Sequence, residues 1–247
     1  MCGRFTQERS TSELAEIFGA EDRADAPGGR FNVAPTDNAA VVVQRDDHRA
    51  ITAYRWGLIP HWSETAGTGN RMFNARSETI DRNAAFKYAF GKRRCLVPVD
   101  AFYEWQRDGN VRNPFAIVRP DGRPLALAGL WAGWKDPDTG EVIRSFTILT
   151  TSPNDAMRPI HNRMPVVVPE SAWDRWLDPT LTKPAELAEL KGLLVPAPDD
   201  ALEIYRVSRR VNSVRNDGPD LVVPLGDVVE EEVARPKPNR IRASAPR

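Results

Sequence analysis

The chain has 247 residues, of which 41% are hydrophobic and 28% charged, a composition typical of a globular protein whose core needs no disulfide support. Its 34 basic residues balance 34 acidic ones, so overall charge argues neither for nor against nucleic acid as a partner. Its two cysteines exclude a disulfide framework and lack metal-ligand spacing.

The elements follow from hydrophobic periodicity and turn residues. The first is a helix at Thr11–Phe18, where Ser10 and Glu13 have capping-box spacing and Gly19 ends the apolar stripe. The others, in chain order, are strands at Ala39–Gln44 and Ile51–Trp56, a helix at Arg82–Phe90 closed by Gly91, strands at Cys95–Val99, Phe102–Gln106, Phe115–Val118, Leu125–Trp131, Ile143–Thr150 and Met164–Val168, helices at Glu170–Leu177 and Pro184–Gly192, and a strand at Ile204–Val207.

Turn residues at 108–110 and 120–122 predict two hairpins in this strand-rich block. Strands outnumber helices and do not alternate regularly with them, which indicates an α+β fold. We expect one domain over residues 1–229. Residues 230–247 are basic and proline-rich, and we interpret them as a disordered tail. No signal peptide or apolar run of roughly 20 residues is present, so we expect a cytoplasmic protein with no membrane partner.

The second residue, Cys2, carries unusual chemical potential. Removal of Met1 would leave an α-amine and a thiol on one residue, with ordinary pKa values of about 7.7–8.0 and about 8.5. The amine can condense with an aldehyde to a Schiff base, and the thiol can then close a five-membered thiazolidine on the same carbon. The other interpretation of Cys2 is an ordinary internal cysteine.

Three further side chains are candidates for catalysis. Glu104 stands between Tyr103 and Trp105, where aromatic neighbours can desolvate a carboxyl group and raise its pKa. His161 and Asn74 lie in apparent loop or strand-end segments. Each also has a purely structural interpretation: a solvated strand glutamate, a loop histidine and a turn asparagine.

Arginines beside aromatic residues indicate how a single nucleic acid strand could be gripped, with charge on phosphates and rings on bases. Arg4, Arg76 and Arg163 are such arginines, and Trp62 and Trp105 could supply stacking surfaces. Tryptophans of the core are the alternative interpretation. No phosphate-binding glycine loop, zinc spacing or serine-hydrolase elbow occurs, and we expect no cofactor and no metal.

Taken together, the motifs resemble the SRAP family (SOS response-associated peptidase), a family of abasic-site processing proteins. The matching segments occur in family order: Met1-Cys2-Gly3-Arg4-Phe5, Phe31-Asn32-Val33-Ala34-Pro35, Trp56-Gly57-Leu58-Ile59-Pro60-His61-Trp62, Asn74-Ala75-Arg76-Ser77-Glu78-Thr79, Arg94-Cys95-Leu96-Val97-Pro98, Phe102-Tyr103-Glu104-Trp105, Ala128-Gly129-Leu130-Trp131 and Ile160-His161-Asn162-Arg163-Met164-Pro165. They cover nearly the whole chain except the tail.

The resemblance implies a curved, barrel-like, mostly antiparallel β core flanked by helices. It also implies a DNA-damage response activity in which Cys2 forms a thiazolidine crosslink to abasic sites in single-stranded DNA, shielding the lesion. In this scheme Asn74 holds the Cys2 terminus, Glu104 moves protons and His161 assists sugar ring opening. Arg4, Arg76 and Arg163 hold phosphates, and Trp105 flanks the strand.

Two positions depart from the family pattern, Asn162 for aspartate and Ala101 for glycine. Two other functions stay open at this point: an amino-terminal-nucleophile thiol peptidase, and a module that binds single-stranded DNA without a covalent bond. We expect a cytoplasmic monomer that associates with the nucleoid when it is bound to DNA, and possible lyase-like Schiff-base chemistry.

Overall fold

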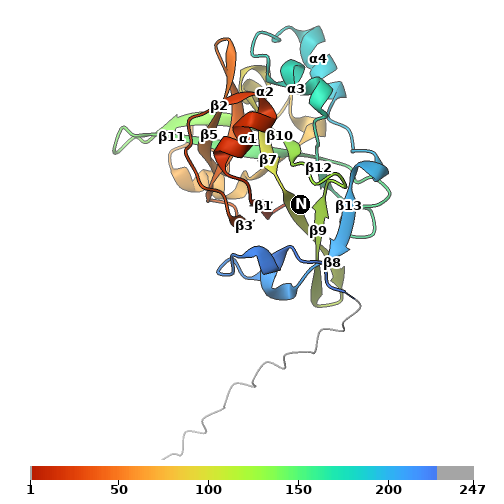
Figure 1. The fold of residues 1–247 in the computed structure, drawn as a ribbon. Coiled ribbons are helices and arrows are strands. Elements are labelled where there is room, and N and C mark those ends of the chain that lie inside the picture. Colours follow the sequence, from red (N-terminus) through yellow and green to blue (C-terminus); the bar gives the residue numbers. More distant parts are fainter. Residues whose placement is uncertain (1, 227–247) are drawn as a thin grey trace, which may run out of the picture.

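A five-stranded barrel organises the computed structural model, which describes residues 2–226. Four antiparallel pairings join β5 to β4, β4 to β7, β7 to β10 and β10 to β11. A parallel pairing of β11 with β5 closes the ring. The strands are β4 (Asn38–Arg45), β5 (His48–Trp56), β7 (Arg94–Val99), β10 (Leu125–Lys135) and β11 (Val142–Thr151). The α+β class with a curved, mostly antiparallel core is therefore confirmed (Figure 1).

Side chains alternate between the inside and the outside of this barrel, as the pleat of a strand requires. In β4, Val41 and Val43 belong to the inner cluster, which also takes alternate residues from the other four strands. Val42 belongs to the outer cluster instead. Helices pack against the outer cluster, namely α1 (Thr11–Phe18), α2 (Lys87–Lys92), α3 (Trp173–Leu177) and α4 (Pro184–Gly192).

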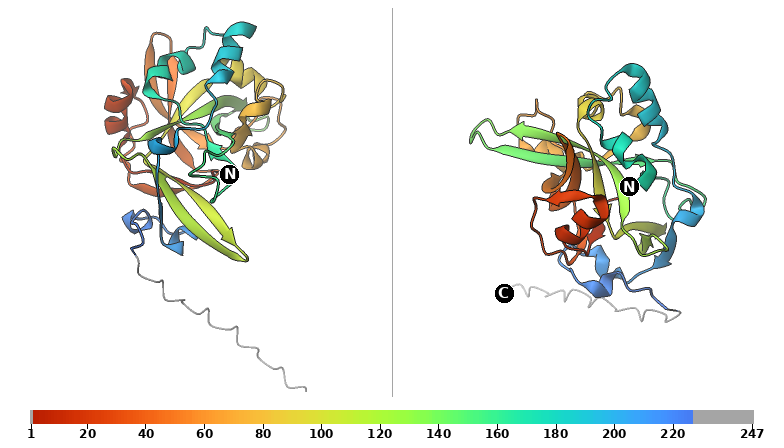
Figure 2. Two further views of the ribbon diagram at one scale, coloured as in Figure 1. Left: turned by 90° about the vertical axis from the view of Figure 1, so that its right-hand side faces the viewer. Right: turned by 45° about the horizontal axis from the view of Figure 1, so that its top comes forward.

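A second sheet covers one end of the barrel, where β7 finishes at Val99. Its strands, in order across the sheet, are β13 (Glu203–Arg206), β9 (Val111–Val118), β8 (Ala101–Asp108), β1 (Phe5–Gln7) and β3 (Arg30–Val33). Phe5 and Phe102 of this sheet join the inner cluster of the barrel. Figure 2 shows the β8–β9 hairpin extending from the body of the molecule.

Short elements complete the described chain. Three strands pair with the barrel strands β5 and β11: β2 (Ala20–Asp22), β6 (Asn74–Arg76) and β12 (Met164–Pro165). The 3-10 helices are η1 (Ala66–Arg71), η2 (Ser77–Thr79), η3 (Glu170–Ala172), η4 (Asp199–Ala201), η5 (Arg209–Asn212) and η6 (Pro219–Leu221). The tail expected at residues 230–247 lies outside the described residues.

The helix expected at Arg82–Phe90 is wrong at its start, because α2 begins only at Lys87. The Asn83 carboxamide accepts a hydrogen bond from the Ala85 backbone N–H at 2.9 Å, a local turn that competes with the helix. Gly91 lies inside α2 rather than ending it. The boundaries of α1 and α4 are confirmed.

The hairpin expected around residues 120–122 is also wrong. A turn forms there, with Gly122 at φ +70°, but β9 and β10 belong to different sheets. Other strands decide this, since β10 pairs on one side with β7 and on the other with β11, the strand that follows it. Of the strand expected at Met164–Val168, only Met164–Pro165 forms β12, and Val167 adds an isolated bridge to Leu127 of β10. The helix expected at Glu170–Leu177 divides into η3 and α3. The 108–110 hairpin is confirmed, because β8 pairs with β9.

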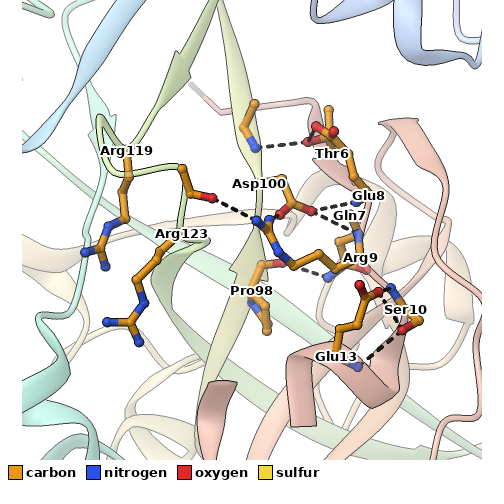
Figure 3. Close-up of polar contacts among 12 residues, drawn as sticks. Thr6, Gln7, Glu8, Arg9, Ser10, Glu13, Pro98, Asp100, Arg119 and Arg123 are labelled. Atoms are coloured by element: carbon orange, nitrogen blue, oxygen red, sulfur yellow. Dashed lines mark hydrogen bonds and ion pairs between the residues drawn. The ribbon is translucent and has the colours of Figure 1, made fainter. Parts of the chain in front are cut away.

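Side-chain contacts fasten the amino-terminal segment to the barrel (Figure 3). The Gln7 carboxamide donates to the Ala40 and Pro98 carbonyl oxygens at 2.9 and 2.8 Å. Asp100, at the junction of the two sheets, accepts from the Glu8 backbone N–H at 2.6 Å and forms an ion pair with Arg9. These buried and partly buried bonds fix β1, and β1 in turn fixes the position of Cys2 just before it.

Candidate active site at the amino terminus

Cys2 is fully buried in the described chain, where it contacts both the barrel core and β6. The Asn74 side-chain amide donates to the Cys2 carbonyl oxygen at 2.7 Å. Asn74 can do so because β6 runs parallel to β11, with Asn74 in register with Ile148. Among the described residues, the buried Oδ1 atom of Asn74 has no hydrogen-bond partner. The same amide group therefore presents an unused acceptor near the Cys2 backbone.

Glu104 faces the same core from β8 and is only 2% exposed. Burial raises the pKa of its carboxyl group to about 7, while the positive charge of the amino terminus opposes this shift. Burial also raises the pKa of the Cys2 thiol, and the negative charge of Glu104 adds to that effect. The two groups are thus electrostatically coupled, and Glu104 can gain or lose a proton near neutral pH.

His161 lies in the turn before β12 and is half-buried. Its Nδ1 atom lies 3.0 Å from the Arg163 backbone nitrogen and 3.2 Å from the Arg163 carbonyl oxygen, so the backbone of Arg163 holds the ring at Nδ1 in either tautomer. Burial lowers the pKa of His161, and the charge of the amino terminus lowers it further. The lowered pKa favours the neutral ring, which carries one N–H group that can donate a proton. That same terminal charge acts on Cys2, Glu104 and His161, which places all three around the start of the chain.

Arg76 and Arg163 lie near each other, on β6 and just before β12. Arg163 forms a two-pronged ion pair with Glu78, with N–O distances of 2.5 and 2.9 Å, and also donates to the Thr150 carbonyl oxygen. Arg76 is exposed and forms no ion pair within residues 2–226, although its charge helps to lower the pKa of Glu78. Arg76 is therefore the member of this pair whose donors are available to a ligand.

Arg4 and Trp105 meet at a different place, the η5 segment. The Arg4 guanidinium donates to the Asn32 side-chain oxygen at 2.9 Å and to the Val211 carbonyl oxygen at 3.0 Å. The Trp105 indole N–H donates to the Asn212 side-chain oxygen at 2.6 Å. Because alternate residues of β8 face opposite sides, Trp105 lies on the other face of the sheet from Glu104. It packs with the small cluster that contains Tyr103 and Val211.

Trp62 is 54% exposed in the loop between β5 and η1. Among residues 2–226, no hydrogen bond or ring contact holds its indole side chain. The ring of its neighbour His61 instead lies 6.2 Å from the ring of Tyr88 in α2. The structure thus gathers Cys2, Asn74, Glu104 and His161 around the start of the chain, and it shows Trp62 as an exposed ring.

Glu78 was not predicted as a site residue, although the segment that contains it, residues 74–79, is one of those that resemble the family. Its role is visible only in the fold, where it binds Arg163 from a segment 85 positions away along the chain. Arg107 was also missed; its positive charge helps to lower the pKa of His161. The alternating pattern of β8 predicts which face Arg107 lies on, but it gives no signal that Arg107 lies close enough to His161 to affect the pKa of that histidine.

We expect Arg76→Ala to weaken binding of unmodified single-stranded DNA and to lower the salt slope of binding by about 0.7, the value for one lost phosphate contact. Binding anisotropy measured over a range of salt concentrations checks this. Arg175→Ala, which breaks an exposed ion pair with Glu189 on the helices, is the charge-matched control and should leave the slope unchanged. A base-dependent loss, or an unchanged slope in Arg76→Ala, would remove Arg76 from the DNA contact.

Within residues 2–226, no group of three His, Cys, Asp or Glu side chains could hold a metal ion. In that same part of the chain, none of the helices has the length and apolar character needed to cross a membrane.

Comparison with known proteins points to one family. A family model described as SOS response associated peptidase (SRAP) matches residues 1–214. The abasic site processing protein YoqW of Bacillus subtilis is 36% identical over 227 residues, covering 90% of this chain and 99% of that protein. The abasic site processing protein HMCES of Pongo abelii is 30% identical, covering 94% of this chain and 78% of that protein.

Solved structures show the same fold. A protein from Bordetella bronchiseptica matches with a TM-score of 0.72 at 29% identity, covering 84% of this chain and 100% of that one. A protein from Bacteroides thetaiotaomicron matches with a TM-score of 0.81 at 24% identity, covering 91% of this chain and 100% of that one. The barrel and its covering sheet are therefore shared features of this architecture.

Proposed function

The chain belongs to the SOS response associated peptidase (SRAP) family, and from that premise we propose that it processes abasic sites in single-stranded DNA by a covalent bond from Cys2. The observation that carries the proposal is the convergence of Cys2, Glu104 and His161 on the start of the chain. The names of the relatives, abasic site processing proteins, support the same substrate. The crosslink would shield the lesion until it is reversed.

The proposed reaction begins after Met1 is removed, when the Cys2 nitrogen becomes a primary amine. This amine attacks C1′ of the ring-opened abasic sugar and expels water to form a Schiff base. The Cys2 sulfur then adds to the same carbon, and the thiol proton passes to the nitrogen, which closes the thiazolidine. One water molecule leaves overall, and no oxidant or reductant is needed.

The neighbouring side chains suit these steps. With a pKa of about 7, Glu104 can accept a proton from the attacking amine and return it to the departing hydroxyl group. Neutral His161 can donate its N–H proton to the sugar ring oxygen as the ring opens. Asn74 fixes the Cys2 carbonyl oxygen and offers its unused Oδ1 atom to the new amine.

The thiol peptidase alternative gains little from this geometry. A peptidase needs a thiolate, whereas burial raises the pKa of the Cys2 thiol and Glu104 raises it further. In the thiazolidine scheme the thiol reacts second, with an already activated carbon, and a preformed thiolate is not required. A non-covalent binding module would leave the coupling of Cys2 with Glu104 without a purpose.

Intact-protein mass spectrometry tests the proposal directly. The purified protein should have the mass of a chain that starts at Cys2, and after incubation with an abasic oligonucleotide it should gain the mass of that strand less one water. The adduct should survive heat and denaturant. An otherwise identical strand without the abasic site should give no adduct. Active protein that retains Met1, or an abasic strand that adds no mass, would refute the mechanism.

A further inference from the structure

Three arginines gather at the end of the barrel that lies away from the covering sheet. Arg93 immediately precedes β7, whose other end leads into Asp100 and β8. Arg45 ends β4, and Arg144 is close to the start of β11. Since β7 has six residues, about 20 Å separates this end of the barrel from the sheet that carries Glu104. We call Arg45, Arg93 and Arg144 the arginine rim.

The rim continues the inward-facing side of the barrel strands. Arg45 follows Val41 and Val43 at alternate positions, and Arg144 precedes Phe146 and Ile148 in the same way. Trp131 of β10 supplies the aromatic centre of the rim, because the Arg45 and Arg93 guanidinium carbons lie 5.8 and 5.1 Å from its ring centroid. The inner cluster thus ends in cations stacked on an indole.

Tyr54 ties the rim together from β5. Its hydroxyl oxygen accepts a hydrogen bond from Arg45 at 2.9 Å, and its ring lies 5.6 Å from that of Trp131. Burial raises the pKa of this hydroxyl group, whereas the charges of all three rim arginines lower it. The arginines are therefore close enough to act on one atom.

No carboxylate neutralises the rim: among residues 2–226, none forms an ion pair with Arg45, Arg93 or Arg144. Asp46 and Asp47 follow Arg45 in the turn, where Asp47 is paired with His48, and Glu141 precedes Arg144 by three residues. Within residues 2–226, neither Asp46 nor Glu141 forms an ion pair with the rim. Three cations held together without counter-charge cost free energy through mutual repulsion, and an anionic ligand would relieve it.

Exposed aromatic rings extend from the rim. The Arg93 guanidinium also lies 5.2 Å from the ring centroid of Tyr88, which is 51% exposed. Tyr88 in turn lies 6.2 Å from the ring of His61, the neighbour of exposed Trp62. Alternating cations and exposed rings are the pattern by which proteins grip single strands, with phosphates on the arginines and bases on the rings.

We propose that the arginine rim and Tyr88 form a second binding surface for single-stranded DNA, which holds the strand beyond the abasic site. This inference rests on the proposed function for the identity of the strand. It offers a role to exposed Trp62, whose neighbour His61 lies against Tyr88 of this surface. In Figure 1 the β10–β11 hairpin, which begins at the rim, projects away from the amino terminus. A DNA strand would therefore have to run along the outside of the barrel to reach both sites.

The test uses Cys2→Ser protein and long, unmodified single strands, so that no covalent chemistry enters the measurement. Arg144→Gln, which alters an exposed side chain, should lower the salt slope of binding by about 0.7. Tyr88→Leu, which removes one stacking ring, should weaken binding about fivefold or more. Arg123→Gln removes the same charge near the opposite end of β10, where Arg123 pairs with exposed Glu170, and should change neither quantity.

Two further measurements separate the possible outcomes. With Cys2 intact, Arg144→Gln should crosslink a short abasic strand at the wild-type rate, which shows that its defect lies in strand binding and not in the chemistry. Inorganic phosphate at low concentration should not displace the strand. Unchanged binding in Arg144→Gln and Tyr88→Leu, an equal loss in Arg123→Gln, or displacement by phosphate alone would overturn the second surface. A failure of the crosslink itself would refute the proposed function and leave these binding results standing.

Discussion

The Cys2→Ser variant should lose the heat-stable adduct with an abasic strand and keep only an adduct that borohydride traps. Serine is as small as cysteine, so Met1 should still be removed and the α-amine should still form a Schiff base. The hydroxyl group is a far poorer nucleophile than the thiol, and ring closure should fail. Denaturing gels with and without borohydride, before and after heating, measure the two adducts. Strand cleavage by β-elimination should increase, because the Schiff base persists.

The second cysteine supplies the matched control. Cys95 is fully buried in β7, and burial raises the pKa of its thiol as well. Cys95→Ala removes a buried thiol of the same kind and should leave the yield of heat-stable adduct unchanged. If Cys2→Ser instead gave a heat-stable adduct in wild-type yield, the thiol would have no part in the reaction and Cys2 would not be catalytic.

Glu104→Gln should slow formation of the thiazolidine without abolishing it, because it removes the ionisable proton and leaves both nucleophiles in place. General acid–base assistance is typically worth about 10²–10⁴-fold, which sets the expected slowing. Release of the strand from a preformed adduct should slow as well, since reopening the ring passes through the same proton transfers. Single-turnover crosslinking and release assays measure the two rates. A wild-type rate in both directions would exclude Glu104 from proton transfer.

The pH dependence should follow from the same carboxyl group. Burial raises its pKa from the usual 4.5 to about 7, so Glu104 is an acid below about pH 7 and a base above it. The crosslinking rate of the wild-type protein should therefore change slope near pH 7, in addition to the change caused by the α-amine at about 7.7–8.0. The change near pH 7 should be absent in Glu104→Gln. The same inflection in both proteins would assign it to another group.

Local patterns in the chain were sufficient for much of the fold. Helix α1 formed with its capping box, in which the Glu13 backbone N–H donates to the Ser10 hydroxyl oxygen at 3.2 Å, because capping depends on neighbouring residues alone. The β8–β9 hairpin formed for the same reason. The turn at 120–122 also formed, but the turn alone does not decide whether its flanking strands β9 and β10 pair with each other, because other strands compete for both. Strand β10 pairs with β7 and β11 instead of with β9.

The sequence by itself determined the family and the α+β class. It also put forward Cys2 as the reactive residue of the proposed mechanism, because a 1,2-aminothiol is a property of one residue at one position. Only the tertiary structure decided which side chains surround it. Glu104 and His161 are far apart along the chain, and their pKa values shift because folding buries them beside the same terminus. Folding likewise left Arg76 available while it engaged Arg163 with Glu78, and it gathered three distant arginines at the barrel end. Burial and long-range pairing create these properties, and neither is encoded in any short segment.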